Sequence, residues 1–404
     1  MIKKIRIAIV VQRYGENISG GAELHARMVA EHLLEVGNVD VFTTCAKDYL
    51  SWKNEFPAGT TRINGVRVNR YPVVEERELP NRTTEDELFQ KSYALDLQYN
   101  WMWRVGPASP ELLKRIERAE PEFDVFIFFT YEYAHAVFGL PLVKHKAILV
   151  PEAHEQQHLQ LPIFRLLFSQ PRAIAYNVPA EQEFVERLTG NHHIPSAIVA
   201  LGVDEPEGYS AERFRQKFGV NGPFITYLGR LVAEKGVDRL IQDFIQYKKI
   251  YPSDLVLVLM GKGNLTIPDR PDIIVTGFVT DQEKYDGLAA ADLLVLPSKW
   301  ESLSIIILEA WLVGTPVLVN FESVVTVAQA QRSQGGLYYR TFEEFAGLLR
   351  RIILDKELQT ALAANGRKFV LENYNWEIIV EKYRQLFKIV MSEPVISTKL
   401  VEHG

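Results

Sequence analysis

Short runs of aliphatic and β-branched residues recur along this chain, and stretches with helical spacing of apolar residues separate them. In the first half the runs are residues 5–11, 39–44, 125–129, 147–150 and 173–177. Nearly continuous apolar runs are typical of parallel strands covered on both faces, because neither face of such a strand meets water. Residues 22–36 have helical spacing, and we expect Gly37 to end that helix. The pattern predicts an α/β protein with doubly wound sheets.

A second series of apolar runs follows a turn-rich segment at residues 202–208. Its members are residues 224–228, 255–260, 273–276, 293–296 and 316–319. A chain of 404 residues is long enough for more than one hydrophobic core. We therefore expect two Rossmann-like domains, residues 1–203 and 204–372, that face a central cleft. A helix over residues 373–391 is expected to cross back to the first domain. Residues 49–110 have weak periodicity and receive no assignment.

Composition excludes some classes of protein. The formal net charge of −6 disfavours a broad nucleic-acid surface, since such surfaces are strongly basic. Cys45 is the single cysteine, so the chain forms no internal disulfide. The apolar run after Lys3, Lys4 and Arg6 has five residues, which suits a first strand better than a signal peptide or a membrane span. We expect a cytoplasmic protein, and a peripheral contact with the inner face of a membrane stays open.

The sharpest local signal follows the strand expected at residues 224–228. Gly229 and Arg230 come directly after it, and Lys235 lies just before a helix that begins near Val237. A helix N-terminus and flexible backbone amides attract anions, and cations neutralise them. Arg230 suits bidentate contact with phosphate oxygens, whereas Lys235 supplies a compact charge. The alternative is a surface turn whose charges are solvated.

Two glutamates follow a later strand. Glu301 lies in the loop after residues 293–296, at the strand end where open α/β sheets bind ligands. Glu309 lies inside the next helix, whose N-terminus near residues 302–304 offers free amide donors. Two carboxylates on either side of a positive helix end suit a ligand with hydroxyls at both ends and a diphosphate in the middle, such as a nucleotide sugar. A plain helix-surface role for both carboxylates is the alternative.

Together these motifs resemble the retaining glycosyltransferases of family 4, also described as glycosyl transferase group 1, which have the GT-B fold. The resemblance covers nearly the whole chain. It rests on Gly-Arg-x4-Lys-Gly at residues 229–236, Glu-x7-Glu at Glu301 and Glu309, Gly314-Thr315-Pro316, the glycine loop at residues 19–23, Gly277-Phe278-Val279 and the helix around Trp376.

The resemblance implies roles for individual residues. Arg230 and Lys235, next to Gly229, would bind the donor diphosphate, Glu309 the ribose and Glu301 the donor sugar. The other donor-binding positions that it implies are Gly20, Gly21, Gly277, Leu303, Ser304 and Ile305. Whether Glu301 acts as a nucleophile, an electrostatic partner or a positioning group stays open.

The chain departs from the family at two places. Leu303-Ser304 stands where relatives usually have Phe-Gly, and Gly261-Lys262-Gly263 lacks the usual acidic middle residue. Backbone contacts should survive the first change. A donor preference inferred from relatives becomes less safe.

His154 follows the strand expected at residues 147–150, at the rim of the first domain's cleft. In relatives a histidine at this place contacts the donor sugar, so the resemblance gives His154 a role at the reaction centre. His154-Glu155-x-x-His158 also matches the zinc motif of metallohydrolases. Pro151 and Pro162 leave little room for the long helix that this motif needs.

The expected reaction is transfer of a sugar, of hexosyltransferase type, from a nucleoside-diphosphate donor to an acceptor hydroxyl with retention at the anomeric carbon. The resemblance implies no metal and no other cofactor, and the chain has no Asp-x-Asp sequence. A carbohydrate or lipid-linked acceptor in cell-surface polysaccharide or glycolipid synthesis is expected. Candidate acceptor or membrane-facing aromatics are Tyr93, Tyr99, Trp101 and Trp103. A zinc metallohydrolase and a non-catalytic nucleotide-sugar-binding module remain as alternatives.

Overall fold

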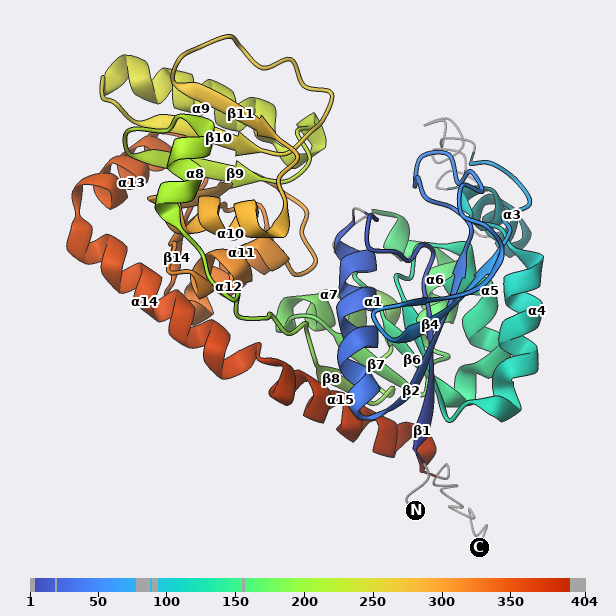
Figure 1. Ribbon diagram of the computed structural model, residues 1–404. Coiled ribbons are helices and arrows are strands. Elements are labelled where there is room, and N and C mark those ends of the chain that lie inside the picture. Colours follow the sequence, from blue (N-terminus) through green and yellow to red (C-terminus); the bar gives the residue numbers. More distant parts are fainter. Residues whose placement is uncertain (1–3, 19, 78–87, 89–93, 155–156, 393–404) are drawn as a thin grey trace, which may run out of the picture. The chain divides into compact units, whose positions relative to one another are not determined.

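A computed structural model of the chain describes residues 4–18, 20–77, 88, 94–154 and 157–392 (Figure 1). The chain divides into two compact units. Unit 1 takes in Met1–Asn177, Gln182–Val199 and Val380–Gly404, and unit 2 takes in Val178–Glu181 and Ala200–Ile379. Ser19, Glu155 and part of the unassigned segment 49–110 lie outside the described residues.

Unit 1 is built on a sheet that, within the described residues, has eight strands in the order β3-β4-β2-β1-β5-β6-β7-β8. The pairs are parallel except for the β3–β4 hairpin. The strands are β1 (Ile5–Val10), β2 (Gly37–Thr44), β3 (Gly59–Ile63), β4 (Val66–Tyr71), β5 (Val125–Phe129), β6 (Ala147–Val150), β7 (Ala173–Tyr176) and β8 (Ser196–Ile198). The five runs predicted in this half match β1, β2, β5, β6 and β7 to within two residues.

Helices cover both faces of this sheet, which explains the apolar runs of its central strands. Every residue of β5 is fully buried, as are Ile7 to Val10 of β1. The helices are α1 (Gly21–His32), α3 (Leu95–Val105), α4 (Pro110–Ala119), α5 (Ala134–Gly139), α6 (Pro162–Phe168) and α7 (Pro179–Thr189), with short 3-10 helices η1 (Leu33–Glu35), η2 (Glu120–Glu122), η3 (Leu140–Lys146) and η4 (Gln157–Gln160).

The expected helix end at Gly37 is wrong. The helix changes to the 3-10 helix η1 and stops at Glu35, and Gly37 is the first residue of β2. A Cβ at Gly37 would overlap the carbonyl oxygen of Ile5, its partner on β1. Gly37 is therefore required for the close approach of two strands rather than for a left-handed cap.

Unit 2 has a parallel sheet, with six strands among the described residues, in the order β11-β10-β9-β12-β13-β14. The strands are β9 (Phe224–Leu228), β10 (Val256–Met260), β11 (Ile273–Gly277), β12 (Leu293–Leu296), β13 (Val317–Asn320) and β14 (Gly336–Tyr339). The five predicted runs match β9 to β13 to within one residue. The order of strands reverses direction between β9 and β12, and ligands of such sheets bind at the carboxyl ends of the strands beside this switch point.

The helices of unit 2 alternate with its strands. They are α8 (Ala211–Phe218), the 3-10 helix η5 (Ala233–Lys235), α9 (Val237–Ile250), α10 (Asp281–Ala290), α11 (Ile305–Leu312), α12 (Val324–Ser333), α13 (Phe342–Leu354) and α14 (Lys356–Asn373). After a break at Tyr374 and Asn375 comes α15 (Trp376–Met391), whose buried face includes Ile379, Tyr383 and Phe387, as the spacing predicts. The boundary between the two units falls inside α15, after Ile379. In the part of the chain that the structure describes, no helix combines the length and apolar character of a bilayer-crossing segment.

Candidate functional site

Glycines pack together at the carboxyl edge of the unit 2 sheet. Gly229 follows β9, Gly261 follows β10 and Gly277 ends β11. The Gly229 N–H donates to the Met260 oxygen at 3.0 Å, and a β-bridge joins Gly261 to Gly277. A Cβ at Gly261 would overlap the Gly229 oxygen. These loops reach their close packing only without side chains, which leaves backbone at the edge where a ligand would bind.

The structure brings Lys235 and Glu301 together although they lie far apart in the sequence. The Lys235 Nζ donates to Glu301 Oε1 at 2.7 Å. Gly236 turns the chain after η5 with φ of 71°, and a Cβ there would stand 2.8 Å from the Pro297 oxygen. This contact holds η5 against the loop after β12. Both partly buried charges therefore face one place at the switch point.

Arg230 lies on the exposed surface beside this pair. A hydrogen bond holds its backbone, because the hydroxyl of Tyr227 donates to the Arg230 oxygen at 2.9 Å. Burial of Tyr227 raises the pKa of its hydroxyl, and the nearby Glu301 charge raises it further. Tyr227 therefore stays neutral and donates its hydrogen bond to the backbone oxygen of Arg230.

Glu309 is held by two residues of α10 that the sequence analysis missed. The Lys284 Nζ donates to Glu309 Oε1 at 2.6 Å, and the Tyr285 hydroxyl donates to the same oxygen at 3.4 Å. Burial alone would lower the pKa of Lys284, but the carboxylates of Glu309 and Asp281 raise it above its ordinary value. Lys284 stays charged. A cation in the first turn of a helix opposes the helix dipole, and that was the available sequence signal for a carboxylate partner.

Ser304 takes an unusual conformation at the start of α11. Its φ is 57° and its ψ 73°, in the left-handed region that favours glycine. The Ser304 hydroxyl oxygen is buried and has no hydrogen-bond partner among the residues that the structure describes. Leu303 is buried, and its carbonyl oxygen accepts from Gln329 Nε2 at 2.6 Å. The backbone at residues 303–305 thus has the turn of a glycine-containing loop, although the sequence places serine there.

In unit 1, Gly20 caps α1 and Gly21 is its first residue. A Cβ at Gly20 would clash with the carboxylate of Glu23, which forms a buried ion pair with Arg13 at 2.6 Å. A Cβ at Gly21 would meet nothing within 4 Å. The side chain of Glu23 therefore explains why position 20 needs a glycine. Position 21 has room for a side chain.

Two carboxylate–histidine pairs lie beyond the ends of β5 and β6. His25 of α1 contacts Glu152 through its Nδ1, and its Nε2 is buried and has no partner within the described part of the chain. Glu152 has a φ of 54°, a costly conformation for a residue with a side chain. His158 Nε2 lies 3.3 Å from Glu132 Oε1. The sequence analysis missed His25, Glu132 and Glu152, which no motif singles out.

The structure separates the members of the zinc motif. His154 lies in an irregular segment after β6, and His158 belongs to the four-residue 3-10 helix η4. They are not presented one turn apart on an α-helix, as that motif requires. Among the described residues, no group of three or more His, Cys, Asp and Glu side chains is arranged to hold a metal ion. Glu155 lies outside those residues.

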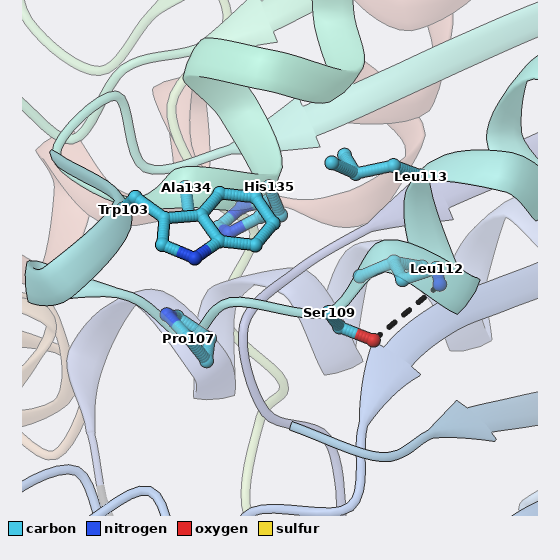
Figure 2. A pocket seen from close by; sticks show the side chains of 7 residues that line it. All are labelled: Trp103, Pro107, Ser109, Leu112, Leu113, Ala134 and His135. Atoms are coloured by element: carbon cyan, nitrogen blue, oxygen red, sulfur yellow. Dashed lines mark hydrogen bonds between the residues drawn. The ribbon is translucent and has the colours of Figure 1, made fainter. Parts of the chain in front are cut away.

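A tight apolar depression with no internal room for a ligand lies elsewhere in unit 1 (Figure 2). Figure 2 shows the residues that line it, which include Trp103, Pro107 and His135 and the side chains of Leu112 and Leu113 from α4. His135 Nε2 bonds to the Phe129 oxygen at 2.7 Å, and burial lowers the pKa of His135 to about 4. A neutral imidazole among apolar residues offers no charge to a diphosphate.

Comparison with known proteins agrees with this geometry. Residues 209–369 match the family model for glycosyl transferases group 1. An uncharacterized glycosyltransferase of Methanocaldococcus jannaschii is 22% identical over 416 residues, covering 96% of this chain and 99% of that protein. The GDP-mannose-dependent monoacylated alpha-(1-6)-phosphatidylinositol monomannoside mannosyltransferase of Corynebacterium glutamicum is 30% identical over 222 residues, which cover 50% of this chain and 56% of that protein.

Another uncharacterized glycosyltransferase of Methanocaldococcus jannaschii matches over 48% of its own length, so several curated relatives align with this chain over about half their length. Among solved structures, Anabaena HepE in complex with UDP and glucose has a TM-score of 0.70 and 16% identity, covering 95% of this chain and 99% of that one. Sucrose-phosphate synthase from Thermosynechococcus elongatus has a TM-score of 0.69 and 18% identity, with coverage of 95% and 99%.

The two sheets and their strand order therefore define a protein of the GT-B fold, which confirms the predicted fold class. The match over residues 209–369, within unit 2, confirms the predicted resemblance to the group 1 glycosyltransferases.

Proposed function

We propose that the protein is a retaining, metal-independent glycosyltransferase of family 4, which moves a sugar from a nucleoside diphosphate to an acceptor hydroxyl. The observation that carries the proposal is the Lys235–Glu301 pair at the switch point of the unit 2 sheet. A cation and a carboxylate in contact there suit a ligand with a diphosphate next to a hydroxyl-bearing sugar. HepE, which shares the fold, has been solved in complex with UDP and glucose and with UDP-glucose.

In the proposed reaction the bond between the anomeric carbon and the diphosphate oxygen breaks, and the leaving diphosphate keeps the electron pair. The acceptor oxygen bonds to the anomeric carbon on the same face and loses its proton. Arg230, Lys235 and the N-terminus of α11 are assigned to the leaving diphosphate, whose charge grows as the bond breaks. This stabilisation needs no metal ion and no further cofactor.

Other residues position the donor in this proposal. Glu301 binds the donor sugar and Glu309 the ribose, and the backbone of Gly229, Gly277 and residues 303–305 contacts the donor. Gly20 and Gly21 approach the phosphates, and His154 contacts the sugar near the reaction centre. The first expected domain, residues 1–203, binds the acceptor, and the second, residues 204–372, binds the donor.

The acceptor is proposed to be a carbohydrate or a lipid-linked glycan in polysaccharide or glycolipid synthesis. Names of relatives support this class, since they include a lipopolysaccharide core glycosyltransferase of Rhizobium meliloti and a capsular polysaccharide glycosyltransferase of Staphylococcus aureus. Such an acceptor agrees with a cytoplasmic enzyme that acts at the inner face of a membrane. Peripheral contact with the membrane is part of the proposal.

The first experiment records thermal unfolding of the full chain with UDP, GDP and ADP and their sugar conjugates, with and without a chelator. Stabilisation by one diphosphate series that the chelator leaves unchanged is expected. Release of that diphosphate from the conjugate, alone or with acceptor, then separates an enzyme from a binding module. Unfolding caused by the chelator, together with no response to nucleotides, would overturn the proposal in favour of a zinc hydrolase.

A matched pair of variants tests the residues. Lys235→Met removes a charge-assisted hydrogen bond worth about 1.5–3 kcal/mol, so affinity for the diphosphate should fall roughly 10- to 150-fold. Lys299→Met is the control, because Lys299 lies near Glu301 in the same loop but pairs with exposed Glu322 at 3.0 Å. Equal affinities of the two variants would contradict the assignment of Lys235.

A further inference from the structure

The carboxyl ends of β5 and β6 carry a cluster for which no role has been assigned. Glu132 follows β5, and His154 follows β6, its parallel neighbour. His158 Nε2 reaches Glu132 Oε1 at 3.3 Å. The side chains of Glu132 and His158 are 24% and 29% exposed, so a ligand can reach both. The cluster lies next to the residue that the proposed function places at the reaction centre.

Aromatic rings fix the orientation of His158. Its ring centroid lies 6.4 Å from that of Trp101 and 6.1 Å from that of Phe164. Trp101 and Phe164 in turn pack edge to face with centroids 6.4 Å apart. The three rings therefore form a triangle in which the imidazole packs against both Trp101 and Phe164, while its Nε2 faces the carboxylate. A positioned carboxylate beside aromatic surface is a chemical arrangement suited to hydroxyl groups on a sugar ring, which has polar edges and apolar faces.

We propose that Glu132, positioned by His158, binds hydroxyl groups of an uncharged sugar residue of the acceptor. This inference rests on the proposed glycosyltransferase function and names the class of acceptor that the same reaction uses. Glu132 accepts hydrogen bonds from the sugar hydroxyls, and His158 holds the carboxylate in place. The acceptor then lies beside His154, where the transferred sugar would be received.

The negative charge of Glu132 at the carboxyl ends of β5 and β6 argues against a phosphorylated acceptor. Burial alone would raise the pKa of Glu132, but the hydrogen bond from His158 and the charges of His158 and His154 lower it below the ordinary range. Glu132 is therefore ionised at neutral pH and repels a phosphate. Residues 130–133 and 151–154, which directly follow the two strands, include no lysine or arginine. A phosphate at this place would meet the ionised Glu132 carboxylate, and neither of these two segments supplies a lysine or arginine to neutralise it.

The test compares acceptors on the full-length protein with the donor that the thermal-shift experiment selects. The probes are the methyl pyranosides of glucose, mannose and galactose, and glucose 6-phosphate and mannose 6-phosphate. At least one methyl pyranoside should accept the sugar better than the phosphorylated probes do. Glu132→Gln should raise the KM for that acceptor about tenfold or more, as expected for one lost hydrogen bond to a charged group. His158→Gln should raise it by a smaller factor.

The control is Glu186→Gln, since Glu186 also pairs with a histidine, His192, at 3.0 Å in unit 1. It should leave the acceptor KM unchanged. Donor hydrolysis without acceptor should be the same in Glu186→Gln as in the unmodified protein. Better transfer to a phosphorylated probe, an unchanged KM in Glu132→Gln, or no transfer to any methyl pyranoside would overturn the inference. Loss of donor hydrolysis in the unmodified protein would instead overturn the proposed function.

Discussion

Ser304 illustrates how far a single residue can depart from its preferred backbone. A residue with a side chain in the left-handed region costs about 1–2 kcal/mol, and glycine there avoids that cost. Glycine loses about 0.5–1 kcal/mol through the greater freedom of the unfolded chain. Ser304→Gly should therefore raise the free energy of unfolding by roughly 0.5–1 kcal/mol, measured by denaturant titration.

Gly314 provides the matched control at the other end of α11. Its φ is 82°, and a Cβ there would meet nothing within 4 Å. Gly314→Ser introduces the strain that Ser304→Gly removes, so it should lower the free energy of unfolding by a similar amount. A loss of stability in Ser304→Gly would show that the serine hydroxyl compensates for its backbone.

His135 should make stability depend on pH. Burial lowers its pKa in the folded protein to about 4 from 6.5, so below pH 6.5 the unfolded chain takes up the proton first. The buried neutral His135 makes its full contribution to the free energy of unfolding above pH 6.5. This contribution is lost as the pH falls toward 4. The loss amounts to about 3 kcal/mol. Chemical denaturation over this pH range should show a smaller loss in His135→Gln, and equal losses in both proteins would refute the assignment.

Some residues of the site could be predicted from the sequence, and others could not. Gly229, Arg230 and Lys235 lie in one short segment after a strand, so sequence alone could place them. The identity of the carboxylate partner of Lys284 could not be predicted, because Glu309 lies on a different helix and only the packing of α10 and α11 brings them together. The same holds for Glu132, whose neighbours come from η4.

At the scale of elements, the two adjacent glycines at the N-terminus of α1 should respond differently to substitution. Gly20→Ala forces Glu23 away from Arg13, a buried pair, and should lower the free energy of unfolding by about 1–3 kcal/mol. Gly21→Ala has open space and a helical backbone, so it should be neutral or stabilise by up to about 1 kcal/mol. Thermal unfolding of the two variants side by side measures the difference. Equal effects would show that Glu23 adjusts without cost.

The contact between α10 and α11 depends on an ion pair whose two side chains are 14% and 10% exposed. Lys284→Met leaves Glu309 without its cation, so unit 2 should lose about 2–4 kcal/mol of stability, and the donor KM should rise. The control is Lys217→Met, since Lys217 pairs with Glu283 of α10 but is 56% exposed. That variant should lose less than about 1 kcal/mol. Similar stabilities in denaturant titration would contradict a structural role for Lys284.

Two of the strands that sequence analysis missed, β3 and β14, share a physical reason. β3 is exposed along nearly its whole length, so its residues show no apolar pattern. It lies at the sheet edge, where pairing with β4 through backbone hydrogen bonds forms the strand. β14 is another edge strand and has four residues. The central strands could be predicted because burial on both faces requires apolar residues, whereas edge strands have no such requirement.

At the scale of the whole molecule, α15 contributes residues to both units, and its second part belongs to unit 1. Phe387 is fully buried in unit 1, so Phe387→Ala should cost that unit about 3–5 kcal/mol. Hydrogen exchange should become faster in β1, β5 and β6, while the affinity of unit 2 for the nucleoside diphosphate stays unchanged. A matched change at exposed Leu371 of α14, which is 42% exposed, should affect neither unit. Loss of nucleotide affinity in Phe387→Ala would contradict separate stabilities.

The division of α15 also sets an order of events during synthesis on the ribosome. Unit 1 begins at the N-terminus, but Val380, Tyr383 and Phe387, which are buried in it, emerge only after all of unit 2. At about 5–20 residues per second, the interval between residues 200 and 390 is roughly 10–40 s. During that time the nascent unit 1 presents an uncovered apolar surface, which is a binding site for chaperones and a source of misassembly. Expression of residues 1–199 alone would leave that surface uncovered permanently.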